Sequence, residues 1–152
     1  EVKYMKLTYV GQKLTVSEYL YLRESVGWKN PCRKQQEKAL EMSLFTLTAY
    51  DDGMPVGMGR IIGDGIYDTI ADVIVLPDYQ RNNIGKTIVG KLLQYIRDTL
   101  PENGSVSIQL IAEKGKEGFY EKLGFRSIPN SESGSGMQLI IRNGEVKSHC
   151  YK

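Results

Sequence analysis

The sequence predicts a mixed α+β (mixed α/β) domain built on a mostly antiparallel sheet. Three observations predict it. Strand-like stretches in the first half follow one another across tight turns, as in a meander. A long amphipathic helix then runs from Ile84 to Leu100. Short strand and helix patterns follow that helix, so one parallel βαβ crossover joins the meander. At 152 residues the chain has the length of one domain, and we assign residues 1–152 to it.

The elements before the meander have clear end signals. A first strand is predicted over Lys3–Val10. Residues Thr15–Glu18 form a capping-box pattern, in which the two end side chains satisfy each other's backbone N–H groups. The helix that starts there is predicted to end at Gly27, which tolerates the left-handed backbone. Asn30, followed by proline, is predicted to cap a second helix that continues to Met42.

The meander itself consists of three predicted strands. Phe45–Tyr50 and Val56–Ile62 form a hairpin about the turn Asp51–Gly53, and Tyr67–Leu76 follows as the third strand, ended by a proline. The chain after the long helix is predicted to form, in order, a strand over Val106–Ala112, a short helix over Lys116–Leu123, and strands over Phe125–Ile128 and Met137–Arg142.

Charge and hydropathy exclude several classes of protein. The 20 basic and 18 acidic residues leave a net charge of +2, which argues against binding nucleic acid through bulk charge. The longest uncharged apolar run, Val73–Leu76, is far shorter than the ~20 residues of a membrane span. No basic region followed by an apolar one is present, so we expect no signal peptide and a cytoplasmic protein.

Cysteine and histidine usage predicts no metal site. Cys32 and Cys150 lie near opposite ends of the sequence, without the spacing of metal ligands, so we expect two free thiols. The single histidine, His149, lies four residues from the end, and Ser-His-Asp or Cys-His chemistry would have to run through that tail.

The stretch Asp72–Lys86 carries the strongest chemical signal. A buried strand enters a polar turn with a glycine, and the turn opens the long helix. The first N–H groups of a helix lack intrahelical partners and its dipole adds about half a positive charge there, so the turn favours an anion such as phosphate. Arg81 and Lys86 flank it. The alternative is an ordinary strand-turn-helix connection with solvated basic residues.

The same turn lies one residue away from a nucleotide-binding P-loop. Residues Gln80–Thr87 match G-x-x-x-x-G-K-[ST] except at the first position. Gln80 has a Cβ where the P-loop glycine lets the backbone curl around phosphates, and the predicted sheet lacks the larger parallel part of such ATPases. We therefore reject a P-loop.

Two segments resemble the GCN5-related N-acetyltransferases. Gln80–Gly85 resembles the family's motif A, [QR]-x-x-G-x-[GA], and Gly118–Phe125, GFYEKLGF, resembles its FYekLGF segment. The element order between and around them also matches, so the resemblance covers nearly the whole chain. It implies the acyl-CoA N-acyltransferase fold, with a sheet that splays near Val75 and helices on both faces. There are two departures: Asn83 replaces a glycine, at small cost to a left-handed turn, and Glu113 replaces a frequent asparagine.

The resemblance implies acetyl-CoA as donor substrate, with its pyrophosphate on the turn and its peptide-like arm along the preceding strand. A backbone N–H of that strand is suited to polarise the thioester carbonyl. The residues implied to contact this donor are Val73, Ile74, Val75, Gln80, Arg81, Asn82, Asn83, Ile84, Gly85, Lys86, Phe119 and Tyr120.

The resemblance implies that the acetyl group moves directly from donor to acceptor in a ternary complex with the enzyme. It also implies two catalytic residues. Tyr120 matches the tyrosine that protonates the leaving thiolate; its phenol pKa of about 10 lies above that of a thiol. The alternative is a packing residue with its hydroxyl at the surface. Asp72 is the candidate base for the attacking amine, with water as an equal rival and with an ion pair to Arg60 as the structural alternative.

The acceptor implied is a primary amine of a small molecule. Trp28 and Tyr67 are the candidate substrate-binding residues, Trp28 as an aromatic wall or alternatively as a core residue. An arylalkylamine, a polyamine and an aminoglycoside all stay open. The rival functions are a protein N-terminal or lysine acetyltransferase and a non-catalytic acyl-CoA-binding regulator. Neither a nucleic acid nor a membrane is expected as a partner. The resemblance allows a homodimer, although no apolar stripe in the sequence demands one.

Overall fold

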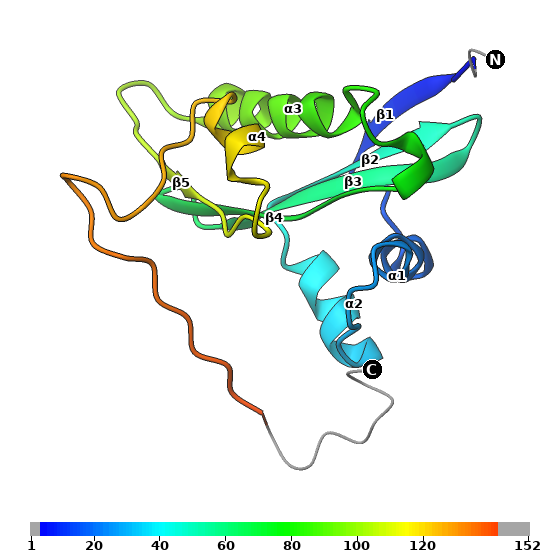
Figure 1. Ribbon diagram of the computed structural model, residues 1–152, viewed down its shortest axis with the longest axis horizontal. Helices are drawn as coiled ribbons and strands as arrows, with labels where there is room; N and C mark the ends of the chain where they lie inside the picture. Colours follow the sequence, from blue (N-terminus) through cyan, green and yellow to red (C-terminus); the bar gives the residue numbers. More distant parts are fainter. Residues whose placement is uncertain (1–3, 143–152) are drawn as a thin grey trace.

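The computed structural model describes residues 4–142 and contains one five-stranded sheet in the order β1-β2-β3-β4-β5. The first four strands pair antiparallel, and β5 pairs parallel with β4. Helices α1 and α2 cover one face, and α3 and α4 the other (Figure 1). The predictions for Lys3, His149 and Cys150 lie outside the described residues. The elements are β1 Leu7–Gly11, α1 Val16–Ser25, α2 Arg33–Glu41, β2 Phe45–Asp51, β3 Met54–Gly63, β4 Tyr67–Val75, the 3-10 turn η1 Pro77–Tyr79, α3 Ile84–Thr99, β5 Ser107–Gln109 and α4 Glu117–Glu121.

The mixed α+β fold and most of its elements are confirmed. The capping box forms at α1, where the Glu18 N–H donates to the Thr15 hydroxyl oxygen and the Thr15 N–H donates to the Glu18 carboxylate. The predicted cap of α2 is wrong, because α2 begins at Arg33 after Cys32. The Asn30 side chain is instead used by α1: its oxygen accepts from Arg23 Nε and its amide donates to Glu24.

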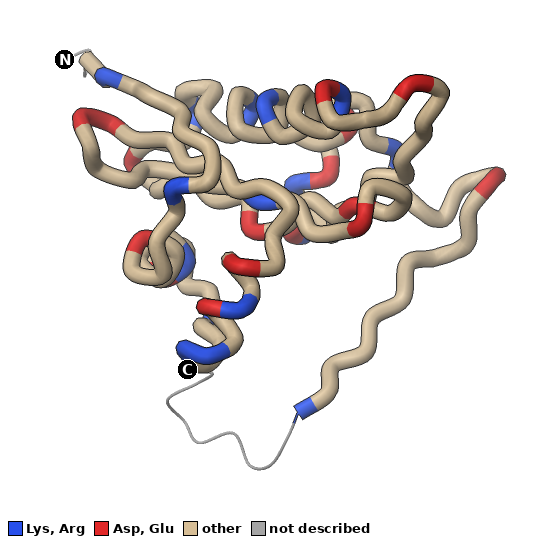
Figure 2. The backbone as a smooth tube through the Cα atoms, turned by 180° about the vertical axis from the view of Figure 1, so that it is seen from behind, with Lys and Arg blue, Asp and Glu red and all other residues tan. Residues whose placement is uncertain are grey.

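Two predicted strands at the end of the chain are also wrong. Neither Phe125–Ile128 nor Met137–Arg142 forms a strand, and β5 is three residues long rather than spanning Val106–Ala112. Every residue from 131 to 142 is exposed, and the segment runs away from the body of the protein (Figure 1). In Figure 2 it carries a charge only at its two ends. Strand propensity alone makes no strand, because a strand needs a neighbour for its hydrogen bonds.

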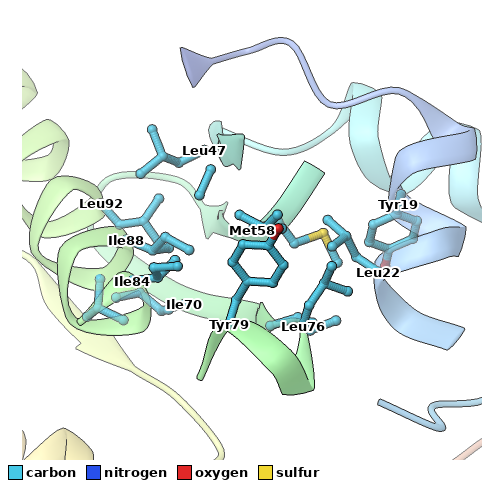
Figure 3. Packing of buried hydrophobic residues seen from close by; sticks show 14 of the residues in the cluster. Tyr19, Leu22, Leu47, Met58, Ile70, Leu76, Tyr79, Ile84, Ile88 and Leu92 are labelled. Carbon is cyan, nitrogen blue, oxygen red and sulfur yellow. The ribbon is translucent and has the colours of Figure 1, made fainter. Parts of the chain in front are cut away.

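The core lies on both sides of β3. Figure 3 shows Ile84, Ile88 and Leu92 of α3 on one side of Met58, with Tyr19 and Leu22 of α1 on the other. Two glycines of β3 let α3 approach the sheet closely. A Cβ on Gly57 would lie 2.9 Å from the Ile74 carbonyl oxygen, and one on Gly59 would lie 2.9 Å from Ile88 and from Leu92. The close packing holds the start of α3 beside the end of β4.

A β-bulge interrupts β4 in the middle of its pairing with β3. Met58 pairs with Ile74 and Arg60 pairs with Ala71, so Gly59 lies opposite both Asp72 and Val73. Asp72 takes the left-handed backbone, with φ of 52°. The extra residue turns the Asp72 side chain toward α1, where it hydrogen-bonds Tyr19, while Val73 faces Gly59 and α3.

The predicted splay of the sheet lies beside this bulge. Pairing between β4 and β5 covers Tyr67–Thr69 and Ser107–Gln109, and the two strands part beyond it. On the side of β4 that faces β5, residues Ile70 to Val75 have no strand partner among residues 4–142, so the backbone groups on that side are left unpaired by the sheet.

Candidate active site

A cleft of 700 Å³ fills the opening between β4, the start of α3 and α4. It brings together almost all of the residues predicted to contact the donor, from three separate parts of the chain. The predicted residues that line it are Trp28, Asp72, Val73, Ile74, Val75, Gln80, Arg81, Asn83, Ile84, Gly85, Lys86, Phe119 and Tyr120. Asn82 and Tyr67 do not line it.

The turn before α3 is shaped by two left-handed residues. Arg81 has φ of 63° and Asn83 has φ of 60°, which places asparagine in the conformation expected of the replaced glycine. Asn83 is the N-cap residue of α3, and its side chain makes no capping hydrogen bond to the described chain. The first intrahelical bond runs from the Thr87 N–H to the Asn83 carbonyl oxygen at 2.9 Å. The N–H groups of residues 84–86 therefore lack intrahelical acceptors, an arrangement that favours an anion at the start of the helix.

Two amide side chains brace the turn. The Asn82 amide donates to the carbonyl oxygens of Tyr79 and Gln80, at 3.1 Å each, so Asn82 holds the loop rather than lining the cleft. The Gln80 amide donates to the Val75 carbonyl oxygen at 3.1 Å. That bond ties the turn to the end of β4 and occupies one of the backbone groups predicted to meet the donor.

Gly85 lies where α3, β4 and α4 meet. A Cβ at this position would lie 3.6 Å from the Phe119 ring and 3.6 Å from Val75. One methyl group therefore fits, whereas a branched side chain would fill the space beside the free N–H groups. In the same helix, a Cβ on Gly90 would meet nothing within 4 Å, which makes Gly90 a matched control.

Tyr120 projects from α4 and is half-buried at the opposite wall of the cleft. Its ring packs edge-on against Phe119 and Phe125, with centroids 4.9 Å and 6.0 Å away. Burial, and then the negative charge of Glu113, raise the pKa of the Tyr120 phenol above its ordinary value. The phenol is therefore protonated throughout the neutral range and is able to donate a proton. Glu113, the charged group that raises this pKa, also lines the cleft.

Asp72 is held by three donors. Its Oδ1 accepts from Arg23 at 2.8 Å, and its Oδ2 accepts from the Tyr19 hydroxyl at 2.7 Å and from Arg60 Nε at 2.6 Å. The side chains of Arg23, Arg60 and Asp72 are 15%, 12% and 11% exposed, so this is a largely buried ion cluster. Burial, followed by the charge of Asp72, raises the pKa of Tyr19 to about 12. The structural alternative, the ion pair to Arg60, is confirmed.

The contributions of Arg23 and Tyr19 were missed by the sequence reasoning. Both come from α1, about fifty positions before Asp72, and no spacing in the sequence connects them to it. Because both carboxylate oxygens are engaged, the geometry favours a positioning role for Asp72 over that of a general base.

The two predicted acceptor residues have different positions. Trp28 lines the cleft, and the Arg23 guanidinium lies over its ring, 5.4 Å from the centroid. Tyr67 is 68% exposed and lies at the far end of β4, opposite Ser107. Trp28 thus lines the cleft and also packs against the hydrophobic core, whereas Tyr67 lies outside the cleft, where β4 and β5 are still paired.

A family model confirms what this geometry indicates. Residues 23–140 match the model of the acetyltransferase (GNAT) domain. The chain belongs to the GNAT acetyltransferase family. It is therefore an acyltransferase enzyme, and the matched region includes both segments that carried the resemblance.

Two solved structures with similar sequences share this fold along most of the chain. A "probable acetyltransferase" from Staphylococcus aureus is 34% identical with a TM-score of 0.77, covering 89% of this chain and 99% of that one. A GNAT-family protein from Streptococcus pneumoniae is 31% identical with a TM-score of 0.75, covering 90% and 99%. The uncharacterized N-acetyltransferase ycf52 of Pyropia yezoensis is 30% identical over 82% of this chain and 72% of its own length.

Among residues 4–142, no group of three or more His, Cys, Asp or Glu side chains is placed to hold a metal ion. No helix in the same described range is long and apolar enough to cross a membrane.

Proposed function

We propose that this GNAT enzyme transfers the acetyl group of acetyl-CoA to a primary amine of a small molecule, by direct attack in a ternary complex. One observation carries the proposal: a single cleft joins the free N–H groups at the start of α3 to the unpaired edge of β4 and to Tyr120. A donor with a pyrophosphate, a peptide-like arm and a reactive thioester matches this order of groups.

The donor fits the cleft from its charged end inward. The N–H groups of residues 84–86, with Arg81 and Lys86 beside them, suit the pyrophosphate. The unpaired edge of β4 offers main-chain hydrogen bonds to the pantetheine arm, as an added strand would receive them. The thioester then lies near α4, where a β4 backbone N–H is suited to stabilise charge that develops on its carbonyl oxygen.

The chemical step balances with the residues present. The amine nitrogen attacks the thioester carbonyl carbon, the carbon–sulfur bond breaks, and the thiolate takes the proton of the Tyr120 hydroxyl, which solvent later restores. The attacking amine loses one proton. We assign that proton to water rather than to Asp72, because the Asp72 carboxylate already accepts hydrogen bonds from Tyr19, Arg23 and Arg60.

The acceptor end supports an amine with an apolar body. Val26, Trp28 and Ile70 line the cleft there, beside the Asp72 cluster. An aromatic face suits an arylalkylamine better than a polyamine or an aminoglycoside, which present mainly charge and hydroxyl groups. A thiol-release assay with an arylalkylamine, a polyamine, an aminoglycoside and a lysine peptide tests this choice, since only the first should turn over rapidly.

Binding of the donor is tested by thermal shift with acetyl-CoA, CoA and ATP in parallel. We expect acetyl-CoA and CoA to stabilise the protein, by about 2.7 kcal/mol at a concentration roughly a hundred times Kd. ATP should give no comparable shift, because it lacks the pantetheine arm. A shift with ATP alone, or none with acetyl-CoA, contradicts the proposed donor.

Gly85→Val should weaken acetyl-CoA binding by about tenfold or more, which corresponds to roughly 1.4 kcal/mol. The branched side chain would crowd Phe119, Val75 and the space beside the free N–H groups. Gly90→Val in the same helix is the control and should bind normally, because its side chain meets open space. Wild-type affinity in a titration of Gly85→Val contradicts the pyrophosphate assignment.

A further inference from the structure

The end of α1 brings Trp28 and Arg23 together. Gly27 takes the left-handed backbone, with φ of 73°, and its N–H donates to the Glu24 carbonyl oxygen at 3.0 Å. The Trp28 N–H donates to the Arg23 carbonyl oxygen, also at 3.0 Å. These two bonds form a Schellman motif, in which the chain folds back over the last turn of the helix. Because the Arg23 guanidinium lies over the Trp28 ring, this helix end presents the tryptophan already stacked on a cation.

The Arg23 guanidinium also joins two separate segments of the chain. Its Nη2 donates to the Lys29 carbonyl oxygen at 2.6 Å, and its Nε donates to the Asn30 side-chain oxygen at 3.2 Å. Its Nη1 donates to Asp72 Oδ1 at 2.8 Å. The first two acceptors lie in the connection between α1 and α2, and the third lies in the bulge of β4. One rigid planar group therefore fixes the connection that carries Trp28 to β4.

Arg23 stands behind the wall of the cleft rather than in it. Val26, Trp28 and Asp72 line the cleft, whereas Arg23 is not among the lining residues. Its side chain is 15% exposed, and the described donors of the guanidinium point to Asp72 and to the connection. Any effect of Arg23 on a bound substrate must therefore be exerted through the residues that it holds.

We propose that Arg23 is a positioning residue that holds Trp28 in place as the wall of the acceptor site and thereby determines how tightly the amine binds. The inference rests on the proposed function, because the amine is the acceptor of that reaction. A wall that is already ordered costs the substrate little conformational entropy on binding. Without the guanidinium, Trp28 would keep its contacts with the hydrophobic core but lose the stacked cation, and each acceptor would have to order the connection.

The donor end of the cleft should be independent of Arg23. Asp72 Oδ2 accepts hydrogen bonds from Tyr19 and Arg60, and both donors remain when Arg23 is replaced. The turn before α3 is braced by its own amide side chains. We therefore expect Arg23 variants to weaken acceptor binding and to leave acetyl-CoA binding near that of the wild type.

The first test is fluorescence, because Trp28 is the only tryptophan in the sequence. In Arg23→Lys, which retains a positive charge for Asp72, the emission of Trp28 should shift to longer wavelength and acrylamide should quench it more strongly. Asn30→Ala removes one anchor of the connection without changing the ion cluster, so it should give a smaller shift in the same direction. Arg33→Lys, at an exposed arginine of α2, is the matched control and should leave the emission unchanged. Circular dichroism checks that each variant is folded.

The second test separates acceptor binding from the chemical step. For Arg23→Lys, the KM of an arylalkylamine should rise by about tenfold or more, as expected for the loss of hydrogen bonds to a charged group. Its kcat and the Kd of acetyl-CoA should stay near those of the wild type, because only binding of the acceptor is weakened. Arg33→Lys should have wild-type values throughout. A role of Arg23 in stability alone would not move the KM.

Unchanged Trp28 emission in Arg23→Lys overturns the proposal, and so does an altered emission with an unchanged acceptor KM. A loss of acetyl-CoA affinity equal to the rise in KM overturns it too, because Arg23 would then support the whole cleft. If the wild type acetylates none of the amines, the proposed function fails instead. The emission of Trp28 requires no turnover and still tests whether Arg23 holds the wall.

Discussion

Tyr120→Phe should lower kcat by about 10²–10⁴-fold while leaving acetyl-CoA affinity near that of the wild type. The change removes only the hydroxyl group; the ring contacts with Phe119 and Phe125 are retained. Because the acid acts in its protonated form, activity should fall as pH rises through the Tyr120 pKa. Burial and Glu113 raise that pKa, so this alkaline limb lies above the ordinary range of tyrosine. The phenylalanine variant should lack the limb.

A matched substitution controls for the general effect of losing a tyrosine hydroxyl. Tyr21 is 44% exposed on α1 and does not line the cleft, so Tyr21→Phe should have wild-type kinetics. An unchanged kcat for Tyr120→Phe removes the acid role. A loss of acetyl-CoA affinity equal to the loss in kcat assigns the hydroxyl to binding instead.

Asp72→Ala should reduce the free energy of unfolding by about 3–5 kcal/mol, which urea titration measures directly. The substitution leaves two largely buried guanidinium groups without their carboxylate and the Tyr19 hydroxyl without its acceptor. Asp98→Ala is the control, because Asp98 is exposed and accepts a hydrogen bond from the Gln94 side chain on the same helix. That variant should change stability by no more than about 0.5 kcal/mol. An equal loss in the two variants contradicts the account of the cluster.

Asp72→Asn separates positioning from proton transfer. If Asp72 positions Arg23 and the bulge, the variant should keep the acidic limb of the pH–rate profile, although its stability falls. Disappearance of that limb restores Asp72 as the general base and overturns our assignment of the proton to water.

Features that depend on residues close together in the sequence were predicted correctly. The capping box at Thr15 and Glu18, the apolar stripe of α3 and the turn at Asp51–Gly53 are all readable over a few residues, and each has its predicted place. The left-handed Asn83 was also predictable, because few residue types adopt that backbone. These features shape the turn before α3, and the residues predicted to contact the donor there, except Asn82, line one cleft.

Features that depend on distant partners were not predictable. The bulge at Asp72 exists because of the register between β3 and β4, and period-two counting along β4 cannot reveal it. The side chains that hold Asp72 come from α1 and β3. Asparagine is a common N-cap residue, but the Asn30 side chain forms hydrogen bonds with Arg23 and Glu24 instead of capping α2. Tyr67 was predicted to bind the acceptor because it lies near a hairpin turn of the meander, whereas β4 and β5 are still paired at Tyr67 and part after Thr69.

The two helices that line the cleft, α3 and α4, are anchored to the hydrophobic core to different extents. α3 buries Ile84, Ile88, Val89, Leu92 and Ile96, whereas the described residues of α4 include no buried one. In hydrogen-exchange terms, α3 amides are exposed mainly by global unfolding, and α4 amides by local opening. The turn before α3 therefore belongs to the more firmly anchored wall of the cleft, and Tyr120 lies on the less firmly anchored wall. Deuterium uptake across α4 should slow when the donor is bound, because the donor occupies the cleft against α4, and uptake in α3 should slow by the factor that the gain in global stability sets.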